Sequence, residues 1–333
     1  MTLISLKRKI YFFLEKSCFR IFLPLLEGVN KIIFHWKDRE KAVHLGSEDS
    51  DKIYYIIRSQ SCEEGLMSLY FNNALSGIVV AKSKGYIPVV SYCDSNCQYW
   101  TKENNKDNNF DNNAWEYYFN QPENVHASDI CNKKNVIFAG WTILNKKTYR
   151  FDFDSFVNGN RDNIKSIVNA YGRVNSCIQD ELDNVSQCLH IGDKTLGVFV
   201  RGTDYIKLKP KGHFKQPCVK DICLKIDEFL DKYEIEKILL ITEDYNIFKE
   251  IRLKYGNLIF SPDNIFVEKY SGDYLEKSFN DRPYDRGFRY ILRLLLLTKC
   301  GYLISSITNG SIFVLAYKND DYKDSFLFNL GKY

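Results

Sequence analysis

The sequence lacks both of the glycine-rich loops that commonly wrap nucleotide phosphates. Neither GxGxxG nor GxxxxGK[ST] occurs in its 333 residues. Such loops let backbone amides approach a pyrophosphate or a triphosphate closely. Their absence argues against a dinucleotide-dependent oxidoreductase and against a P-loop NTPase.

Paired metal ligands are also lacking. The ten cysteines include no CxxC, the closest pairs being Cys93/Cys97 and Cys218/Cys223, and the five histidines are scattered singly. Zinc sites and disulfide frameworks both need closer or more regular spacing. We therefore expect reduced thiols in a cytosolic protein and no metal site.

No apolar run near the N-terminus is long enough to cross a membrane. The charge-free residues 21–26 fall far short of the ~20 residues that a spanning helix needs. Residues 1–45 form a basic amphipathic segment, in which cations alternate with Phe, Leu and Ile: Lys7, Arg8, Lys9, Lys16, Arg20 and Lys31. Two interpretations stay open, a helix lying on an anionic membrane surface through residues 1–40 and a packed helical region broken by Pro24. We expect a cytoplasmic protein, peripheral on the inner face of the membrane in the first case.

The bulk composition is that of a globular protein. With 45% hydrophobic and 26% charged residues, 333 residues suffice for two domains and a sizeable core. The net charge of +4 is too small to indicate a nucleic-acid partner. It is compatible with an anionic ligand or with an acidic membrane surface.

Strands and helices alternate along both halves of the chain. The first half predicts strands at residues 52–60, 87–92 and 135–141, helices over 64–85 and within 155–188, and a long polar loop over 94–113. The second half predicts strands at 196–201, 237–242, 257–261 and 301–306, and helices over 218–233, 245–256, 287–300 and 309–320. This alternation is typical of parallel, doubly wound sheets. We expect two α/β domains, residues 46–190 and 191–333, with a ligand cleft between them.

Polar residues follow three predicted strands of the second half, where ligands of parallel sheets gather. The first group is Arg201-Gly202-Thr203-Asp204, followed by a basic loop with Lys209, Lys211 and His213. Arginine offers a planar fork of donors for phosphate oxygens, and glycine lets a ligand approach the backbone. Two interpretations of this group stay open, a phosphate site and an Arg201–Asp204 ion pair that braces the turn.

The other two strand ends carry carboxylates and hydroxyls. Glu243 and Asp244 precede a predicted helix, so one of them is expected either to cap that helix or to contact a nucleotide base or ribose. Before the last apolar helix stand Ser305, Ser306, Thr308, Asn309, Gly310 and Ser311. Free amides at a helix start with hydroxyls beside them predict an anion site.

Taken in order, these strand ends resemble a known family. "GVFVRGTDY", "ILLITED" and "LLLLTKCGYLISSITNGSIFVLAY" resemble the three C-terminal motifs of the fucosyltransferase superfamily. In the first half, "GLMSLYFNNALSGIVVAKSKGYIPVV" and "NAWEYYFNQP" look like proteins of bacterial surface-polysaccharide clusters. The resemblance covers about residues 50 to 333. It implies an α/β GT-B fold, two facing Rossmann-like domains with parallel sheets, and inverting, metal-free transfer of fucose from GDP-fucose to a glycan.

The resemblance also implies roles for individual residues. Arg201 would bind the β-phosphate of GDP-fucose, and Asp244 or Glu243 would contact guanine. The remaining donor-binding residues would be Gly202, Thr203, Lys209, His213, Thr308, Asn309, Gly310 and Ser311. Three positions depart from the family pattern: Phe199 replaces a common histidine, Gly202 a second arginine, and Arg293 a carboxylate. The first departure leaves the identity of the base, and hence of the donor, open.

Transfer to a hydroxyl requires a general base, for which a carboxylate in the cleft is suited. The candidates are Asp204, Glu64, Asp94 and Glu116. On the acceptor side we also expect Gly65, in the turn after the first strand, and Trp100 and Trp115, with core packing an equally good explanation of Trp115. The partners would be a nucleotide sugar and a glycan acceptor on a lipid. Two alternatives remain, another nucleotide-sugar donor on the same fold and a non-catalytic glycan-assembly protein.

Overall fold

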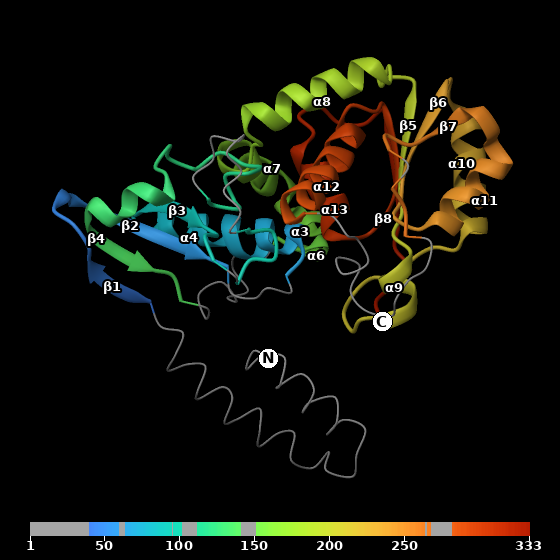
Figure 1. The fold of residues 1–333 in the computed structure, drawn as a ribbon. Coiled ribbons are helices and arrows are strands. Elements are labelled where there is room, and N and C mark those ends of the chain that lie inside the picture. The colour runs from blue at the N-terminus through green and yellow to red at the C-terminus, as the bar shows by residue number, and fades with distance from the viewer. Residues whose placement is uncertain are drawn as a thin grey trace, which may run out of the picture.

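The chain forms two β-sheets with helices packed against both. The computed structural model describes residues 40–59, 64–94, 96–101, 112–140, 151–263, 265–267 and 282–333. Most of the basic N-terminal segment, residues 1–39, lies outside the described residues. Figure 1 shows the two sheets side by side, with α12 and α13 between them.

The first sheet has four strands in the order β1-β4-β2-β3. Its strands are β1 (Lys41–His44), β2 (Glu48–Arg58), β3 (Ile87–Ser91) and β4 (Lys133–Phe138). β2 is parallel to both β3 and β4, while β1 pairs antiparallel with β4. Residues 41–44 therefore belong to this sheet, although the sequence pattern grouped them with the basic segment.

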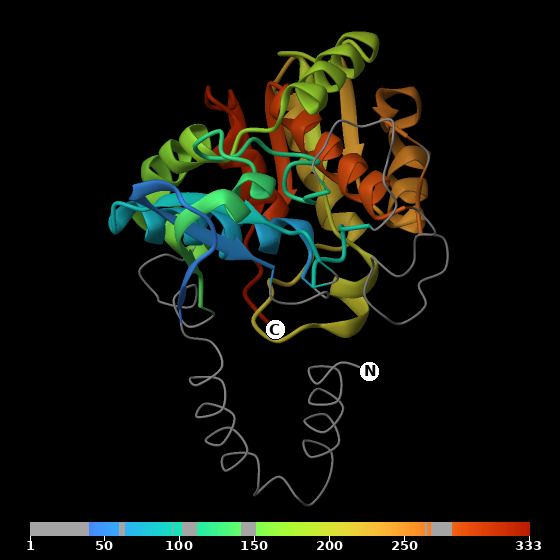
Figure 2. The same cartoon turned by 60° about the vertical axis from the view of Figure 1, so that its left-hand side comes forward.

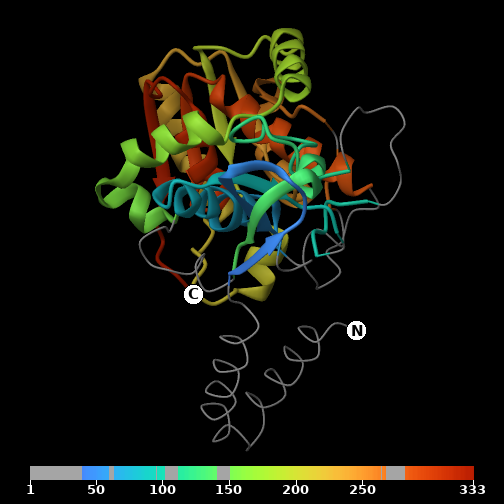
Figure 3. The same ribbon diagram turned by 90° about the vertical axis from the view of Figure 1, so that its left-hand side faces the viewer.

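One continuous helical stretch connects β2 to β3. It consists of α3 (Leu66–Ser68), a π-helical segment (Leu69–Leu75) and α4 (Ser76–Ser83). A short 3-10 helix (Ala127–Asn132) leads into β4. Further along the chain, α6 (Phe153–Ser155), a second π-helical segment (Phe156–Asn160), α7 (Arg161–Tyr171) and α8 (Ser176–Cys188) lead to the second sheet. Figure 3 views the molecule from the side of the first sheet.

The second sheet has five parallel strands in the order β7-β6-β5-β8-β9. They are β5 (Thr195–Phe199), β6 (Lys237–Ile241), β7 (Ile259–Phe260), β8 (Tyr302–Ser306) and β9 (Asp324–Phe328). The helices are α9 (Thr203–Leu208), α10 (Val219–Lys232), α11 (Tyr245–Tyr255), α12 (Pro283–Thr298) and α13 (Asn309–Tyr317), with a 3-10 turn (Gly256–Leu258) after α11. In sequence order the strands run 3-2-1-4-5, which is the Rossmann arrangement. The predicted fold class, two α/β halves with parallel strands, is confirmed.

The strand order places a topological switch point between β5 and β8. Connections from these neighbouring strands leave toward opposite faces of the sheet, so a crevice opens outside their carboxyl ends. Both strands are buried along their whole length. Their ends are the first and third polar groups of the sequence.

A continuous apolar core joins the two halves. Gly310 to Tyr317 of α13 are buried on every side, as expected for a helix enclosed between layers. Phe313 of α13 packs edge-on against Tyr70 of the first half, with ring centroids 5.2 Å apart. Tyr118 of the first half donates a hydrogen bond to the Tyr284 carbonyl at the start of α12 (2.9 Å). Trp115 is buried in this core and stacks on Phe119 (4.5 Å).

Candidate active site at the sheet edge

A cavity of about 410 Å³ opens between the two halves at the carboxyl ends of β5, β6 and β8. The first half contributes the turn after β2 and Tyr99, and the second half contributes three strand ends, α9 with its following loop, and one face of α12. Of the residues proposed from the sequence, the cavity is lined by Glu64, Gly65, Arg201, Asp204, His213, Glu243, Thr308, Asn309 and Gly310. Residues more than a hundred positions apart in the sequence therefore meet at one place.

Arg201 lies at the end of β5 in a nearly buried ion-pair network. Its Nε donates to Glu243 Oε1 (3.0 Å) and its Nη2 donates to Asp204 Oδ1 (3.1 Å). The guanidinium also lies over the Tyr205 ring, 4.9 Å from its centroid. Burial alone would lower the pKa of Arg201, but the two carboxylates outweigh burial and raise it. The side chain is thus charged and held in one orientation, and the ion pair expected from the sequence is present.

The carboxylates after β6 both support the turn after β5. Glu243 Oε1 accepts from the Gly202 amide (2.9 Å) and the Thr203 hydroxyl (3.2 Å) as well as from Arg201. Asp244 caps α11 by accepting from the Asn246 amide (2.9 Å), and its other oxygen accepts from the Thr203 amide (3.2 Å). Capping, one of the two roles expected here, is therefore observed for Asp244. Glu243 lines the cavity, whereas Asp244 is not among its lining residues.

The first turn of α13 lines the same cavity as Arg201, at the end of the neighbouring strand β8. Thr308 is the N-cap, since its hydroxyl accepts from the Ser311 amide (3.3 Å) while the Ser311 hydroxyl accepts from the Thr308 amide (2.8 Å). The amides of Asn309 and Gly310, in the first turn, have no acceptor within the helix. The helix therefore presents two N–H groups and its positive dipole end to the cavity. The Ser311 side chain serves the cap and is buried.

Three arginines of α12 line the cavity, and the sequence pattern did not identify two of them. Arg286, Arg289 and Arg293 are spaced by three and four residues, which places them on one helix face. Arg293 donates to Asp263 through Nε (3.0 Å) and Nη2, and its Nη2 also donates to the Ile265 carbonyl (2.8 Å). The i, i+3, i+7 spacing of these arginines was the sequence signal that could have indicated a common helix face. It is hidden in the sequence because the same helix also carries the apolar residues that fill the core.

Glu64 faces the cavity from the turn after β2. Its Oε2 atom is buried and has no hydrogen-bond partner among the described residues. Burial raises the pKa of this carboxyl above its ordinary value. Gln98 fixes the turn by donating to the Glu64 carbonyl (2.7 Å). Glu64 is therefore the carboxylate that the first half directs into the cavity.

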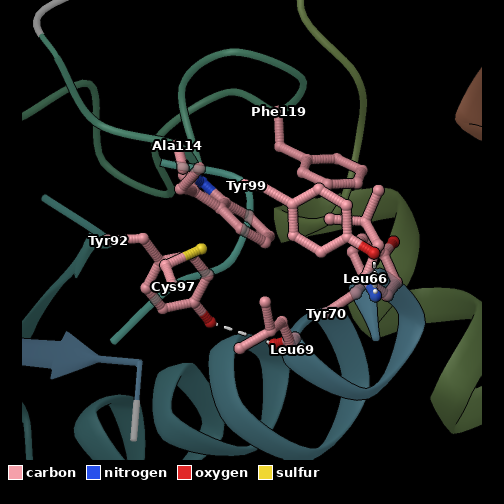
Figure 4. Close-up of a pocket in the computed structure, with 9 residues that line it drawn as sticks. Leu66, Leu69, Tyr70, Tyr92, Cys97, Tyr99, Ala114 and Phe119 are labelled. Atoms are coloured by element: carbon pink, nitrogen blue, oxygen red, sulfur yellow. Dashed lines mark hydrogen bonds between the residues drawn. The ribbon is translucent and has the colours of Figure 1, made fainter. Parts of the chain in front are cut away.

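An aromatic cluster supports the turn from behind. Figure 4 shows Tyr92, Tyr99 and Phe119 packed around the start of the helix after this turn. The Tyr99 hydroxyl accepts from the Leu66 amide (3.1 Å), and the Tyr92 hydroxyl donates to the Leu69 carbonyl (3.0 Å). Two side-chain hydroxyls thus hold the first helical turn beside Glu64 in place.

The loop after α9 contributes His213 to the cavity wall. The His213 ring lies edge-on to Tyr205 (5.3 Å), so it adjoins the Arg201 network. Its backbone pairs with the C-terminal residues, where the Tyr333 amide donates to the His213 carbonyl (3.0 Å) and the Lys215 amide donates to the Gly331 carbonyl (2.9 Å). Figure 2 shows this loop beside the C-terminus. Desolvation of the ring beside the Arg201 network lowers the pKa of His213.

The other predicted site residues do not line this cavity. Lys209 and Lys211 are exposed on the loop, and Asp94 accepts from the Asn96 amide at the surface (2.9 Å). Glu116 is buried, bonded to His126 Nδ1 (2.7 Å) and accepting from the Asn113 amide group (3.0 Å). Gly202 and Thr203 form the turn behind Arg201, and Trp100 Nε1 donates to the Asn112 carbonyl (3.0 Å).

The described residues contain neither a metal-binding cluster nor a membrane-spanning helix. None of their groupings of three or more His, Cys, Asp or Glu side chains has the arrangement of a metal site. Within the same residues, every helix is too short or too polar to span a bilayer.

No protein-family model and no curated protein matches the chain. Among solved structures it is similar to NodZ α1,6-fucosyltransferase soaked with GDP-fucose, with 13% identity, 76% of this chain and 88% of that chain covered, and a TM-score of 0.43. It is also similar to NodZ from Bradyrhizobium (14%, 76% and 88%, 0.41) and to POFUT1 in complex with GDP-fucose (10%, 84% and 75%, 0.36). Because these TM-scores are low, the architecture described above is taken from the strand order and register of this chain alone.

Proposed function

We propose that the chain is an inverting, metal-independent glycosyltransferase that moves fucose from GDP-fucose to a hydroxyl of a growing surface polysaccharide or lipid-linked glycan. The observation that carries the proposal is that Arg201 and the first turn of α13 line one cavity together, at the switch point between the neighbouring strands β5 and β8. The choice of fucose and guanine follows from the resemblance of the three strand-end motifs to the fucosyltransferase superfamily.

The leaving diphosphate would lie between Arg201 and α13. A guanidinium fork and helix-terminal amides can stabilise the charge that develops on the β-phosphate, which is usually the largest catalytic contribution. Glu243 and Asp204 hold Arg201 oriented before the donor arrives. The amides of Asn309 and Gly310 would contact phosphate oxygens, and His213 would close the cavity over them.

Glu64 is the general base of this proposal. The acceptor hydroxyl would give its proton to the Glu64 carboxylate while its oxygen bonds to the anomeric carbon of the donor sugar. The bond between that carbon and the β-phosphate oxygen breaks, and its electron pair leaves with GDP. Of the four carboxylates considered from the sequence, Asp94 and Glu116 are not among the cavity-lining residues, and Asp204 pairs with Arg201.

The guanine would lie toward Glu243 and Thr242 at the end of β6, since both residues line the cavity. Asp244 stands behind this position and would act through the α11 cap and the turn at Thr203. The contact with the base is thus assigned to Glu243 rather than to Asp244.

Calorimetry with GDP, UDP, CMP and GDP-fucose in the presence of EDTA tests the proposal. The variants are Arg201→Lys, which keeps the charge but loses the fork, and Arg252→Ala, which removes an exposed arginine of α11. We expect GDP to bind more tightly than UDP and CMP. Arg201→Lys should weaken GDP binding about tenfold or more, because charge-assisted hydrogen bonds contribute about 1.5–3 kcal/mol. Arg252→Ala should leave it unchanged.

Other outcomes each contradict a defined part of the proposal. A preference for UDP or CMP would retain a nucleotide-sugar enzyme and overturn the fucosyl donor. Binding that requires a divalent cation would overturn metal independence. Failure of all four ligands to bind would overturn the enzyme and favour a non-catalytic assembly protein.

Peripheral attachment to the inner membrane face through residues 1–40 is a separate part of the proposal. Its support is the alternation of cations with large apolar residues in that segment. Deleting residues 1–40 should move the protein from the membrane fraction to the supernatant, and unchanged partitioning would contradict the attachment.

A further inference from the structure

One face of α12 contributes several arginines to the lining of the cavity. Arg286, Arg289 and Arg293 all line it. With a rise of about 1.5 Å per residue, the outer two lie about 10 Å apart along the helix axis. The two ends of this row of arginines have different neighbours.

At its C-terminal end the row belongs to the second half. Arg293 is neutralised by the bidentate pair with Asp263 and bonds the Ile265 carbonyl. At its N-terminal end the helix adjoins the first half, where the Tyr284 carbonyl accepts from the Tyr118 hydroxyl. Arg286 therefore lies toward the acceptor side of the proposed site, and Arg289, three residues further along the helix, lies between it and Arg293.

Arg286 is linked through Gln98 to the turn that carries the proposed base. Its Nη2 donates to the Gln98 carbonyl (3.1 Å), and the Gln98 side chain donates to the Glu64 carbonyl (2.7 Å). The guanidinium also lies over the Tyr99 ring, 5.4 Å from its centroid. One residue, Gln98, thus joins Arg286 to Glu64, so a group bound by Arg286 would be close to the reacting hydroxyl.

In the proposed function the diphosphate is met by Arg201 and by the start of α13, at the ends of the neighbouring strands β5 and β8, so Arg286 and Arg289 are not needed for it. Arginine forks match carboxylate and phosphate oxygens in a bidentate geometry, and a cleft lined by positive charge concentrates anionic substrates. We infer that Arg286 and Arg289 form an anion subsite for the acceptor, so the acceptor glycan carries a carboxylate or a phosphate beside the hydroxyl that receives the sugar. This inference rests on the proposed function.

Calorimetry with three probes tests the inference: a disaccharide ending in glucuronic acid, its neutral counterpart ending in glucose, and glucose 1-phosphate. Each is titrated with and without saturating GDP. The variants are Arg286→Gln/Arg289→Gln, the charge-keeping Arg289→Lys, and Arg282→Gln as a control, since Arg282 is an exposed arginine that pairs with Asp285 on the same helix. Urea unfolding of each variant establishes that it is folded.

We expect at least one acidic probe to bind about tenfold or more tightly than the neutral disaccharide. The double variant should remove that preference and leave GDP binding within about twofold, whereas Arg282→Gln should change neither. Arg289→Lys should retain part of the preference, because it keeps the charge and loses the fork. Preference for the glucuronide assigns the subsite to a carboxylated sugar, and preference for the sugar phosphate assigns it to a glycosyl phosphate.

Equal binding of neutral and acidic probes would overturn the inference. So would loss of GDP affinity in the double variant, since that would make both arginines donor ligands. Failure of GDP to bind the unmodified protein would contradict the proposed function instead, and the titrations without GDP would still decide the subsite.

Discussion

At the scale of single residues, Arg201 shows how a ligand site is prepared before the ligand is present. A buried guanidinium needs compensation, and Glu243 and Asp204 supply it at 3.0 and 3.1 Å. Removing one member of such a network leaves an uncompensated buried charge, which typically costs about 3–5 kcal/mol. The tests above therefore rely on Arg201→Lys rather than on truncation.

Gly202 is required by the close approach of its neighbour Asp244. A Cβ at this position would lie 2.6 Å from both Cβ and Oδ2 of Asp244, which caps α11. Gly202→Ala should lower the free energy of unfolding by about 1–3 kcal/mol and weaken GDP binding, because the turn that orients Arg201 must shift. Urea denaturation and calorimetry measure these effects. Gly192→Ala, where a Cβ meets nothing within 4 Å, is the control and should change little.

Glu64 gives a pH prediction. A base acts when deprotonated, and burial raises the pKa of this carboxyl above 4.5, so the rate should rise with pH through that raised value. Glu64→Gln should lower kcat about 10²–10⁴-fold and abolish this acidic limb. An unchanged limb in the variant would assign the base elsewhere.

The same shift predicts the effect of Glu64 on stability. A folded-state pKa above the unfolded one gives stability below the unfolded pKa that is lost as pH rises through the folded pKa. At pH 7 the ionised, partly buried carboxylate therefore disfavours folding. Glu64→Gln should leave the free energy of unfolding at pH 7 unchanged or higher, as urea denaturation would measure, and a large loss would point to a structural role.

At the scale of elements, the capping box at the start of α13 fixes the proposed phosphate site. Thr308→Ala should remove the bond to the Ser311 amide and lower the free energy of unfolding by about 1 kcal/mol. It should also weaken GDP binding, because the amides of Asn309 and Gly310 lose their alignment. Thr308→Ser keeps the hydroxyl and is the matched control. Unfolding curves and GDP titrations of both variants make the comparison.

The loop at His213 depends on its pairing with the C-terminal residues. Deleting residues 331–333 removes the bonds from Lys215 to Gly331 and between His213 and Tyr333. Hydrogen exchange at the Lys215 amide should accelerate, and GDP should bind more weakly. Lys332→Ala keeps these backbone bonds and removes only a side chain, which pairs with Asp154 and lies over the Phe214 ring of the loop (4.8 Å), so it should change exchange at Lys215 much less than the deletion does. If exchange at the Lys215 amide were the same with and without residues 331–333, the loop would keep its conformation without the C-terminal pairing.

Most central elements were predictable from periodicity, because buried strands such as β5 and β8 are short apolar runs ending at polar residues. The edge strands β1 and β9 were not predicted, since three of the four positions of β1 are exposed and β9 begins with the polar Asp324 and Ser325 and has only Phe328 buried. The three strand-end clusters indicated one edge of a sheet. The residues that line the cavity were harder to predict from the sequence. Glu64 and Arg286 come together through tertiary packing around Gln98, which no spacing reveals.

At the scale of the whole molecule, the two halves share one apolar core and should unfold together. All four tryptophans precede residue 142, so their fluorescence reports the first half.

Phe313→Ala in α13 should lower the free energy of unfolding by about 3–5 kcal/mol and lower the urea midpoint equally by tryptophan fluorescence and by circular dichroism. Phe229→Ala, buried in the separate core beside α10, is the control for a mutation remote from the shared core. Its fluorescence and dichroism transitions should also coincide. A urea midpoint by fluorescence that is unchanged in Phe313→Ala would mean that the halves unfold separately.

The packing of α13 against the first half has a consequence during synthesis. Tyr70 is made early, but the Phe313 ring that covers it leaves the ribosome only about 240 residues later. The same delay holds for the first-turn amides of α13 and for the residues that pair with the loop at His213. Until then a nascent chain has its first sheet but neither its shared core nor a closed cavity. A shortened product of this gene would therefore expose apolar surface and lack the proposed site at once, which makes it a substrate for chaperones and proteases rather than a weak enzyme.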